Sequence, residues 1–453
     1  MSAPVVVIGA GWAGLSAAVR LADAGLPVML LEEGPRLGGR ATAFLDRESG
    51  EHVDNGQHVL FGCYRETYAF LRRIGTAGLA PLQPRLELTM VGSRGERARL
   101  RCPRLPAPWH LVAGVLGWSA LPFGDRRTAL RLRRVIKDVR RDGAAAVAAR
   151  VPPDQTVDVW LQEHGQSPGL AEWLWHPLAL AALNQSPATA AAAPFVRVLG
   201  ELFSSNPSSA AVGLPAVPLD DLCATPAKAY IEERGGMVQL RAPARVELTD
   251  AGAIRAVYAG DARIDTSCVI SAVPWFGFGR LWPRGAPPPL ARVAEHAAAT
   301  DSSPIVTVNL WLDGPALDAG ERFVGLVRGP AQWVFDKRAL WDDRAGHIAV
   351  VVSGADSIVR MDNAQATETV LRQLRKVLPR LADRQLLRSV VVREHRATFS
   401  LAPDAPPRPP TVTDLPGFYL AGDWTDTGLP GTIESAVVSG HRAAEAVIRR
   451  NRP

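Results

Sequence analysis

Cysteine and lysine are scarce in this 453-residue chain, and each shortage narrows what the protein can be. The four cysteines, Cys63, Cys102, Cys223 and Cys268, lie far apart and form no C-x-x-C pair. We therefore expect no disulfide, no iron–sulfur cluster and no zinc or other metal site, and a reducing cytoplasm fits this usage. Lysine occurs only four times, so arginine supplies nearly all the positive charge behind the formal net charge of +6. No aromatic-interleaved basic stripe accompanies that charge, and we expect no nucleic-acid partner.

Long apolar runs are also missing, and none reaches the roughly 20 residues needed to span a bilayer. The apolar stretch from Trp109 to Phe123 is too short for that purpose. It is followed by Arg126-Arg127 and by a basic segment from Arg131 to Arg141 with helical spacing. An apolar wedge beside a basic helix is typical of an interfacial membrane anchor, and an ordinary cap helix with a solvated basic face is the alternative.

The clearest motif lies in the first forty residues. Val5 to Ile8 is a short β-branched run that predicts a buried parallel strand. A complete G-x-G-x-x-G follows over residues 9–14 and opens a helical pattern that ends at Gly25. A second apolar strand, Val28 to Leu31, ends on Glu32. This order of strand, glycines, helix, strand and acid predicts a dinucleotide-binding βαβ unit.

The glycines, the helix start and the acid of that unit each have a physical role. Gly9 allows the tight turn, Gly11 lets the backbone approach a pyrophosphate, and Gly14 lets the helix pack closely on the strand. The helix N-terminus offers N–H groups and a positive dipole end to the phosphates. Glu32 stands where an acid accepts the ribose hydroxyls and repels a 2′-phosphate.

Two further groups of polar and glycine residues follow. Gly38-Gly39-Arg40 indicates a backbone that passes close to a ligand, with a guanidinium available for phosphate. Residues 54–58, Asp-Asn-Gly-Gln-His, form a polar cluster in an apolar context, for which a plain turn is the alternative. Near the C-terminus a predicted strand, 418–421, leads into Gly422-Asp423, and a helix opens at residues 431–436.

The rest of the chain alternates between helical and strand patterns. We predict helices over 65–74, 157–164, 170–183, 220–233 and 364–378, and a pair of strands over 86–91 and 97–102. Alternation over 305–311, 332–335 and 347–353 predicts an antiparallel sheet, the floor of a substrate domain. The helical region contains three large aromatic side chains, Trp160, Trp173 and Trp175, which suggest an apolar cavity wall. Tryptophan is more often a core residue, which is the alternative.

Together these motifs resemble the flavin-dependent amine oxidase and phytoene desaturase superfamily. The resemblance implies an α/β fold in which a glutathione-reductase-type Rossmann domain binds FAD and an α+β substrate domain supplies an antiparallel sheet and a helical cap. It implies an FAD-binding domain of residues 1–75, 215–290 and 395–453, and a substrate domain of residues 76–214 and 291–394. The positions that match the superfamily's FAD contacts are Gly9, Gly11, Trp12, Ala13, Gly14, Glu32, Glu33, Gly39, Arg40, Ala41, Gly56, Gln57, Val246, Gly422, Asp423, Thr432 and Ile433.

Longer phrases narrow the resemblance within the superfamily. Residues 54–64, 177–184, 396–399 and 421–430 are similar to the squalene-associated FAD-dependent desaturases, the hydroxysqualene dehydroxylases of hopanoid synthesis. That family uses reduced FAD to replace the hydroxyl of hydroxysqualene, a long polyene isoprenoid, with hydrogen. A carotenoid-type desaturase is the main alternative. An amine oxidase is weaker, because none of the lysines falls in the 305–311 strand, and intact glycine and acid positions disfavour a flavin-free prenyl-binding escort protein.

The catalytic acid is the least defined part of this prediction. His58 follows the flavin-facing turn and titrates near neutrality, which makes it our candidate for protonating the leaving hydroxyl. Asp54, Tyr64 and Asp426 compete with it, as does a mechanism without a dedicated acid. No second G-x-G-x-x-G is evident for a nicotinamide, so an external electron donor is expected. Because the substrate lives in the bilayer, we expect a cytoplasmic protein attached peripherally to the inner face of the cytoplasmic membrane.

Overall fold

A parallel five-stranded sheet carries the N-terminal motif. The computed structural model describes residues 3–204, 206–341 and 346–451. All neighbouring strands of this sheet run parallel, as predicted for the βαβ unit. Their order is β19 (Phe418–Leu420), β13 (Val269–Ser271), β1 (Val5–Ile8), β2 (Val28–Leu31) and β9 (Met237–Gln239).

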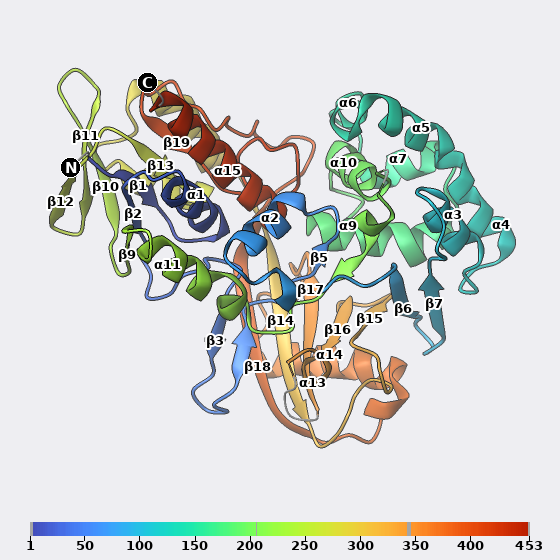
Figure 1. Cartoon of the computed structure of the whole chain (residues 1–453). Helices are drawn as coiled ribbons and strands as arrows, with labels where there is room; N and C mark the ends of the chain where they lie inside the picture. Colours follow the sequence, from blue (N-terminus) through green and yellow to red (C-terminus); the bar gives the residue numbers. More distant parts are fainter. Residues whose placement is uncertain (1–2, 205, 342–345, 452–453) are drawn as a thin grey trace.

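Helix α1 (Trp12–Asp23) packs against α11 (Thr225–Glu232) and the C-terminal α15 (Ile433–Arg450), as Figure 1 shows. The contact with α15 is close because α15 carries a glycine there, and a second glycine brings α1 close to the turn before it. A Cβ on Gly440 would lie 2.2 Å from the carbonyl oxygen of Ala13, and one on Gly14 would lie 1.8 Å from that of Gly9. These two glycines therefore fix the spacing between the glycine-rich turn, the first helix and the last helix.

The second large layer is a seven-stranded sheet. Its order is β18 (Leu386–Phe399), β14 (Ser302–Leu312), β17 (His347–Ser353), β16 (Trp333–Asp336), β15 (Phe323–Leu326), β6 (Glu87–Val91) and β7 (Arg97–Arg101). The predicted antiparallel sheet is present, but it is larger and mixed, because β6 joins parallel to β15. Helix α14 (Asn363–Val377) covers one face and starts at an Asp362–Gln365 capping box.

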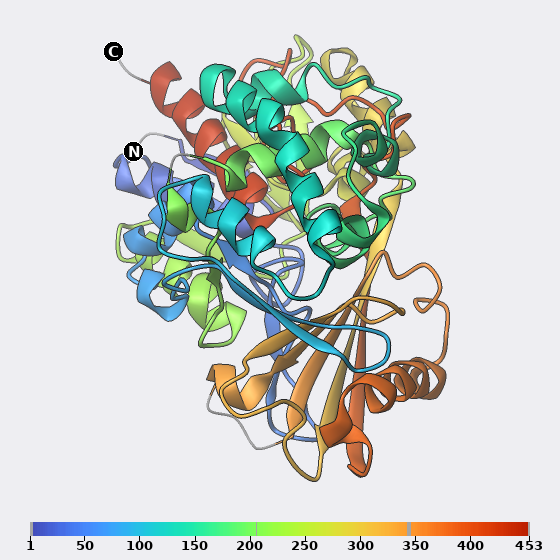
Figure 2. The same cartoon turned by 90° about the vertical axis from the view of Figure 1, so that its right-hand side faces the viewer.

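A helical region lies above this sheet, as seen in Figure 2. The predicted single apolar stretch from Trp109 to Phe123 is divided: α3 ends at Leu116 and α4 begins only at Phe123. The helices of this region are α3 (Trp109–Leu116), α4 (Phe123–Arg126), α5 (Arg133–Asp142), α6 (Ala144–Ala148), α7 (Val157–Glu163), α8 (Pro168–Leu170), α9 (His176–Leu183) and α10 (Ala192–Leu202).

Smaller elements connect these layers. They are α2 (Arg65–Arg73), α12 (Ala291–Ala299), α13 (Lys337–Trp341), the pairs β3 (Ala43–Leu45) with β4 (His52–Asp54) and β5 (Leu60–Phe61) with β8 (Val212–Gly213), and the meander β10 (Ala244–Leu248), β11 (Ile254–Ala259) and β12 (Ala262–Asp265). None of the helices in the described part is long and apolar enough to cross a membrane. The same residues hold no group of His, Cys, Asp and Glu suited to a metal ion.

Asn184 ties the helical region to the seven-stranded sheet. It ends α9 in the left-handed conformation, with φ 52°, and is buried. Its amide nitrogen donates to the Ser303 carbonyl oxygen and to Thr398 Oγ1, both at 3.1 Å, and its amide oxygen accepts from Gly354 N at 2.8 Å. Asparagine suits both demands, because it tolerates left-handed backbone and offers a donor and an acceptor.

Replacing this residue tests the connection. We expect Asn184→Ala to lower the free energy of unfolding by about 3 kcal/mol, because it leaves buried polar groups unpaired and keeps the unfavourable backbone conformation. Thermal and urea unfolding would measure the change. Asn363→Ala, on an exposed position, is the control and should change it by less than about 0.5 kcal/mol. Equal stability of the two variants would contradict this role.

Candidate active site

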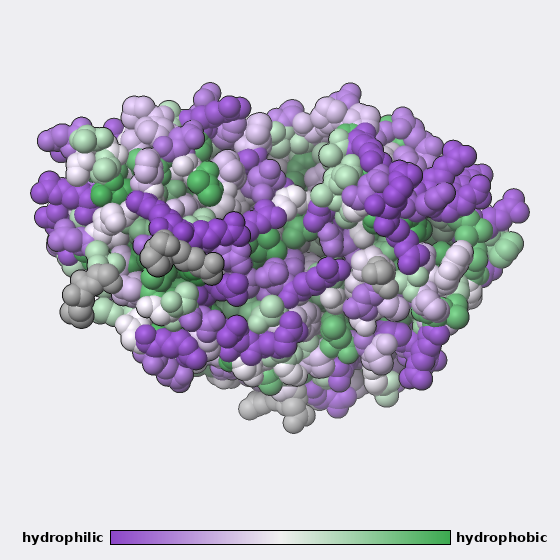
Figure 3. Space-filling view, turned by 45° about the horizontal axis from the view of Figure 1, so that its top comes forward, coloured by the Kyte–Doolittle hydropathy of each residue, from purple (hydrophilic) through white to green (hydrophobic). Residues whose placement is uncertain are grey.

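One cavity of about 840 Å³ runs between the parallel sheet, the seven-stranded sheet and the helical region. Figure 3 shows apolar surface in a hollow of the molecule between its two lobes. Most of the residues predicted to contact a dinucleotide line this cavity. They are Gly9, Gly11, Trp12, Ala13, Glu32, Glu33, Gly39, Arg40, Ala41, Gly56, Gln57, Gly422, Asp423, Thr432 and Ile433, and His58 lies with them.

Two of the predicted contact residues are not on the cavity wall. Gly14 faces the Gly9 carbonyl instead, where it permits the packing of α1 on the turn. Val246 is a buried residue of β10 in the meander, and its neighbours Ala244 and Arg245 line the cavity. A contact between the backbone of Val246 and the cofactor stays a prediction.

The glycine turn and the first acid form a site suited to a nucleotide. Gly11 caps α1 without a side chain, so no side chain occupies the N–H groups of the first turn. Glu32 is held at the end of β2, where its two carboxylate oxygens accept from the backbone N–H groups of Ala10 and Gly34, each at 2.8 Å. A Cβ on Gly39 would lie 3.0 Å from the Gly11 Cα, so only glycine lets the two loops approach.

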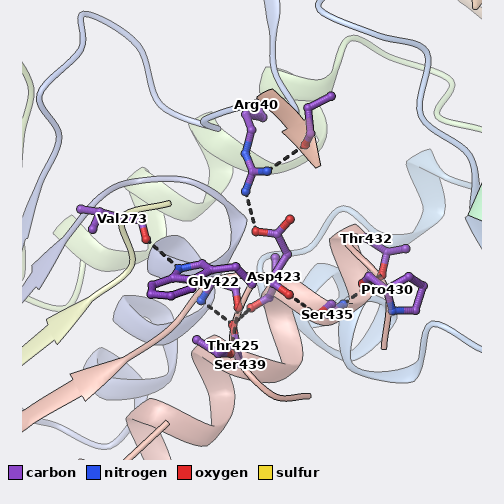
Figure 4. A network of polar contacts seen from close by, with 12 residues as sticks. Arg40, Val273, Gly422, Asp423, Thr425, Pro430, Thr432, Ser435 and Ser439 are labelled. Carbon is purple, nitrogen blue, oxygen red and sulfur yellow. Dashed lines mark hydrogen bonds and ion pairs between the residues drawn. The ribbon is translucent and has the colours of Figure 1, made fainter. Parts of the chain in front are cut away.

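Arg40 and Asp423 line this end of the cavity and belong to the network of polar contacts in Figure 4. The guanidinium of Arg40 is 2.5 Å from the Asp423 carboxylate and donates to the Ala397 carbonyl oxygen at 2.8 Å. The backbone oxygen of Asp423 accepts from Ser435 Oγ at 3.1 Å, and Thr432 Oγ1 caps α15 by accepting from Ser435 N at 3.2 Å. Helix N-termini, an acid for ribose and a positioned guanidinium are the groups that a bound FAD requires.

The turn at residues 54–58 forms the polar middle of the cavity. His58 Nδ1 is 2.6 Å from the Gly56 carbonyl oxygen, and because a carbonyl only accepts, this nitrogen carries the proton. Nε2 is left to interact with groups in the cavity. Burial lowers the pKa of His58 below its usual 6.5, and the nearby Asp54 carboxylate opposes that shift.

Of the competing acids, Tyr64 lines the cavity, whereas Asp426 lies outside it and faces Arg408 at 3.7 Å. Burial raises the pKa of the Tyr64 hydroxyl, which therefore keeps its proton. Sequence reasoning missed Glu394, a carboxyl on β18 that also lines the cavity and accepts from Asn55 Nδ2 at 3.3 Å. It lies across the sheet from Ile305, and no local pattern singled it out.

The opposite end of the cavity is apolar. Trp173 and Trp175 line it, as the sequence indicated, but Trp160 belongs to the core, where it stacks on His164 at 4.0 Å. Trp118 was missed; it meets Trp173 edge to face at 6.0 Å on the cavity wall. Other members of this wall are Leu86, Leu88, Met90, Leu100, Leu111, Val115, Leu174 and Leu178. A long apolar ligand would be shielded from water here.

Sequence and structure comparisons agree with this site. Residues 12–448 match the family described as flavin-containing amine oxidoreductase. The chain is 32% identical to a hydroxysqualene dehydroxylase of Rhodopseudomonas palustris, with 100% of both chains covered, and 26% identical to a probable zeta-carotene desaturase of Synechococcus elongatus, with 98% of both covered. An oxidoreductase structure from Methanosarcina mazei matches its fold with a TM-score of 0.72 at 17% identity, over 98% of this chain and 99% of that one.

These findings settle the family and the cofactor class. A second hydroxysqualene dehydroxylase, from Sinorhizobium fredii, is 29% identical over 98% of both chains. The matched family is flavin-containing, which gives FAD as the cofactor. The chain is therefore an FAD-dependent oxidoreductase of the flavin-containing amine oxidoreductase family and belongs, within it, to the hydroxysqualene dehydroxylases.

Proposed function

We propose that this protein reductively removes the hydroxyl of hydroxysqualene to give squalene, in hopanoid or squalene synthesis. The observation that carries the proposal is the continuity of the cavity. The dinucleotide-binding turn and the tryptophans of the helical region line the same space. The 32% identity to a full-length hydroxysqualene dehydroxylase supports a long polyene as its occupant.

The cavity offers what the reaction needs. The hydroxyl is allylic, so its loss as water with one added proton leaves a delocalised cation, which a hydride then converts to the hydrocarbon. Reduced FAD would supply that hydride, and an external donor must first reduce it. Trp118 and Trp173 exclude water, which would otherwise capture the cation. His58, protonated on Nε2, would give the proton to the departing oxygen.

The same proposal assigns two sets of residue ranges to the cofactor and to the substrate. Residues 1–75, 215–290 and 395–453 would bind FAD, with the cavity-lining residues of the predicted set as its contacts. Residues 76–214 and 291–394 would hold the polyene. All strands of the parallel sheet belong to the first group, whereas β18 crosses the boundary at residue 395.

A desaturase that oxidises a carotenoid precursor is the second candidate, because the Synechococcus elongatus zeta-carotene desaturase matches over nearly its whole length. Product analysis separates the two reactions. We expect anaerobic, chemically reduced holoenzyme to convert hydroxysqualene to squalene, detected by gas chromatography and mass spectrometry. If oxidised holoenzyme instead desaturates phytoene or zeta-carotene, and the reduced form leaves hydroxysqualene unchanged, the proposal is wrong.

The reaction also predicts a pH dependence through His58. Because burial lowers its pKa below 6.5, the Nε2 proton is present only below that lowered value and is lost as the pH rises through it. Turnover of the reduced enzyme should therefore increase as the pH falls below 6.5. His58→Ala should reduce turnover by about 10²-fold with FAD still bound, and should remove this limb of the profile.

Glu394→Gln is the matched control, since it removes the charge of Glu394, the cavity carboxyl on β18 that the sequence did not predict. It should keep both the turnover and the pH profile of the wild type. If His58→Ala keeps near-normal turnover while Glu394→Gln loses it, the proton comes from Glu394 and the role given to His58 is wrong.

We further propose that the substrate enters from a membrane surface near α3. The entry face consists of the exposed apolar side chains of Leu105, Trp109, Phe123 and Leu130, of which Trp109 is 61% and Phe123 60% exposed. Leu111 and Val115, on the same helix as Trp109, line the cavity, so α3 lies between the surface and the site. Desolvation, followed by the charges of the nearby arginines 101, 104 and 99, lowers the pKa of Arg85. Together with the basic helix α5, these arginines would attract anionic lipid.

Liposome binding tests this attachment to the inner face of the cytoplasmic membrane. We expect Trp109→Ala with Phe123→Ala to weaken binding to anionic liposomes by about tenfold or more, because two aromatic side chains no longer insert. Leu387→Ala, which removes a side chain 62% exposed on β18, is the control and should bind like the wild type. Unchanged binding of the double variant would exclude this face.

A further inference from the structure

Lys337 is a buried cation at the centre of the molecule. It begins α13 directly after β16 and is 0% exposed. Phe335, two residues earlier on β16, lines the cavity, whereas Lys337 itself is not among the lining residues. Two of the hydrogen bonds of its ammonium go to the turn that follows β4: to Asp54 Oδ2 at 3.1 Å and to Gln57 Oε1 at 2.6 Å.

The surroundings of this lysine hold it in one position. Its Nζ lies 3.2 Å from the centroid of the Trp341 ring, an arrangement that stabilises an ammonium. Asp54 is 1% exposed and provides the opposite charge. A buried ammonium is costly unless it is paired and hydrogen-bonded, so these contacts fix Lys337, and Lys337 in turn fixes the turn that carries Gln57 and His58.

The lysine also decides which way the Gln57 amide points. An ammonium has three donors and no acceptor, so the amide atom 2.6 Å from it must be the oxygen. The amide nitrogen is therefore on the other side, where it lies 3.4 Å from the His58 carbonyl oxygen. Gln57 lines the polar middle of the cavity. The side of the amide that is turned away from Lys337 therefore offers an N–H donor.

We infer that Lys337 is a positioning residue that orients Gln57 so that an amide N–H, rather than a carbonyl oxygen, faces the bound flavin. The flavin ring presents carbonyl oxygens and ring nitrogens, which accept such a hydrogen bond. A donor at this point stabilises the electron-rich reduced ring more than the oxidised ring. The inference concerns cofactor binding and does not depend on which polyene is the substrate, so its test stands apart from the test of the reaction.

A double-mutant cycle tests the orienting role. We would compare wild type, Lys337→Met, Gln57→Leu and the double variant by the dissociation constant for FAD and the midpoint potential of the bound flavin. Each single change should weaken FAD binding by about tenfold and make the potential more negative. The double variant should bind FAD no more weakly than the single variant with the lower affinity, because Lys337 acts through Gln57. The inference would be overturned if the losses of FAD affinity in the two single variants multiplied in the double variant. It would also be overturned if Lys337→Met kept the wild-type potential and affinity.

Two further variants guard against a general loss of stability. Val308→Ala shortens a fully buried side chain on the face of β14 that packs against α14 and does not line the cavity. It should lower the melting temperature without changing FAD affinity. Gln57→Glu keeps the shape and the oxygen that faces Lys337 but replaces the cavity-facing N–H with oxygen. It should weaken FAD binding at least as much as Gln57→Leu, even if Lys337→Met does not fold. Wild-type affinity of Gln57→Glu would overturn the inference.

Discussion

The ion pair between Arg40 and Asp423 joins parts of the chain that lie almost 400 residues apart, with a sequence separation of 383. The same guanidinium donates to the carbonyl oxygen of Ala397, near the C-terminal end of β18. The N-terminal loop, the loop that precedes the C-terminal helix and the seven-stranded sheet therefore meet at one partly buried point. Arg40, Asp423 and Ala397 all line the cavity, so this contact joins the parts of the cavity wall that the three segments provide.

The cavity depends on two opposite environments being held side by side. At one end, backbone N–H groups, Glu32 and Arg40 suit a charged cofactor. At the other, tryptophan and leucine side chains suit a hydrocarbon and exclude water. The turn at residues 54–58 lies between them and contributes polar groups to the middle of the cavity. Lys337 lies behind that turn, so its charge fixes the turn without exposing an ammonium to the apolar end.

Sequence alone was sufficient where the signal is local. The β1–α1–β2 unit, Glu32 and the Gly39–Arg40 loop were found because glycine, β-branched and acidic residues have fixed spacings there. Asp423 and Thr432 were identified through resemblance. Lys337 was considered only as absent from the 305–311 strand, and it reaches Asp54 across 283 residues of sequence. Glu394 and Trp118 were missed for the same reason, since sheet register and helix packing place them, and neither has a local pattern.

The structure of the holoenzyme with squalene bound tests the central claim most directly, namely that one cavity holds both flavin and polyene. We expect FAD along the glycine turn, Arg40 and Thr432, and the hydrocarbon against Trp118, Trp173 and Trp175, with one end of the polyene beside His58. A polyene bound outside this cavity, or separated from the flavin by protein, would contradict it.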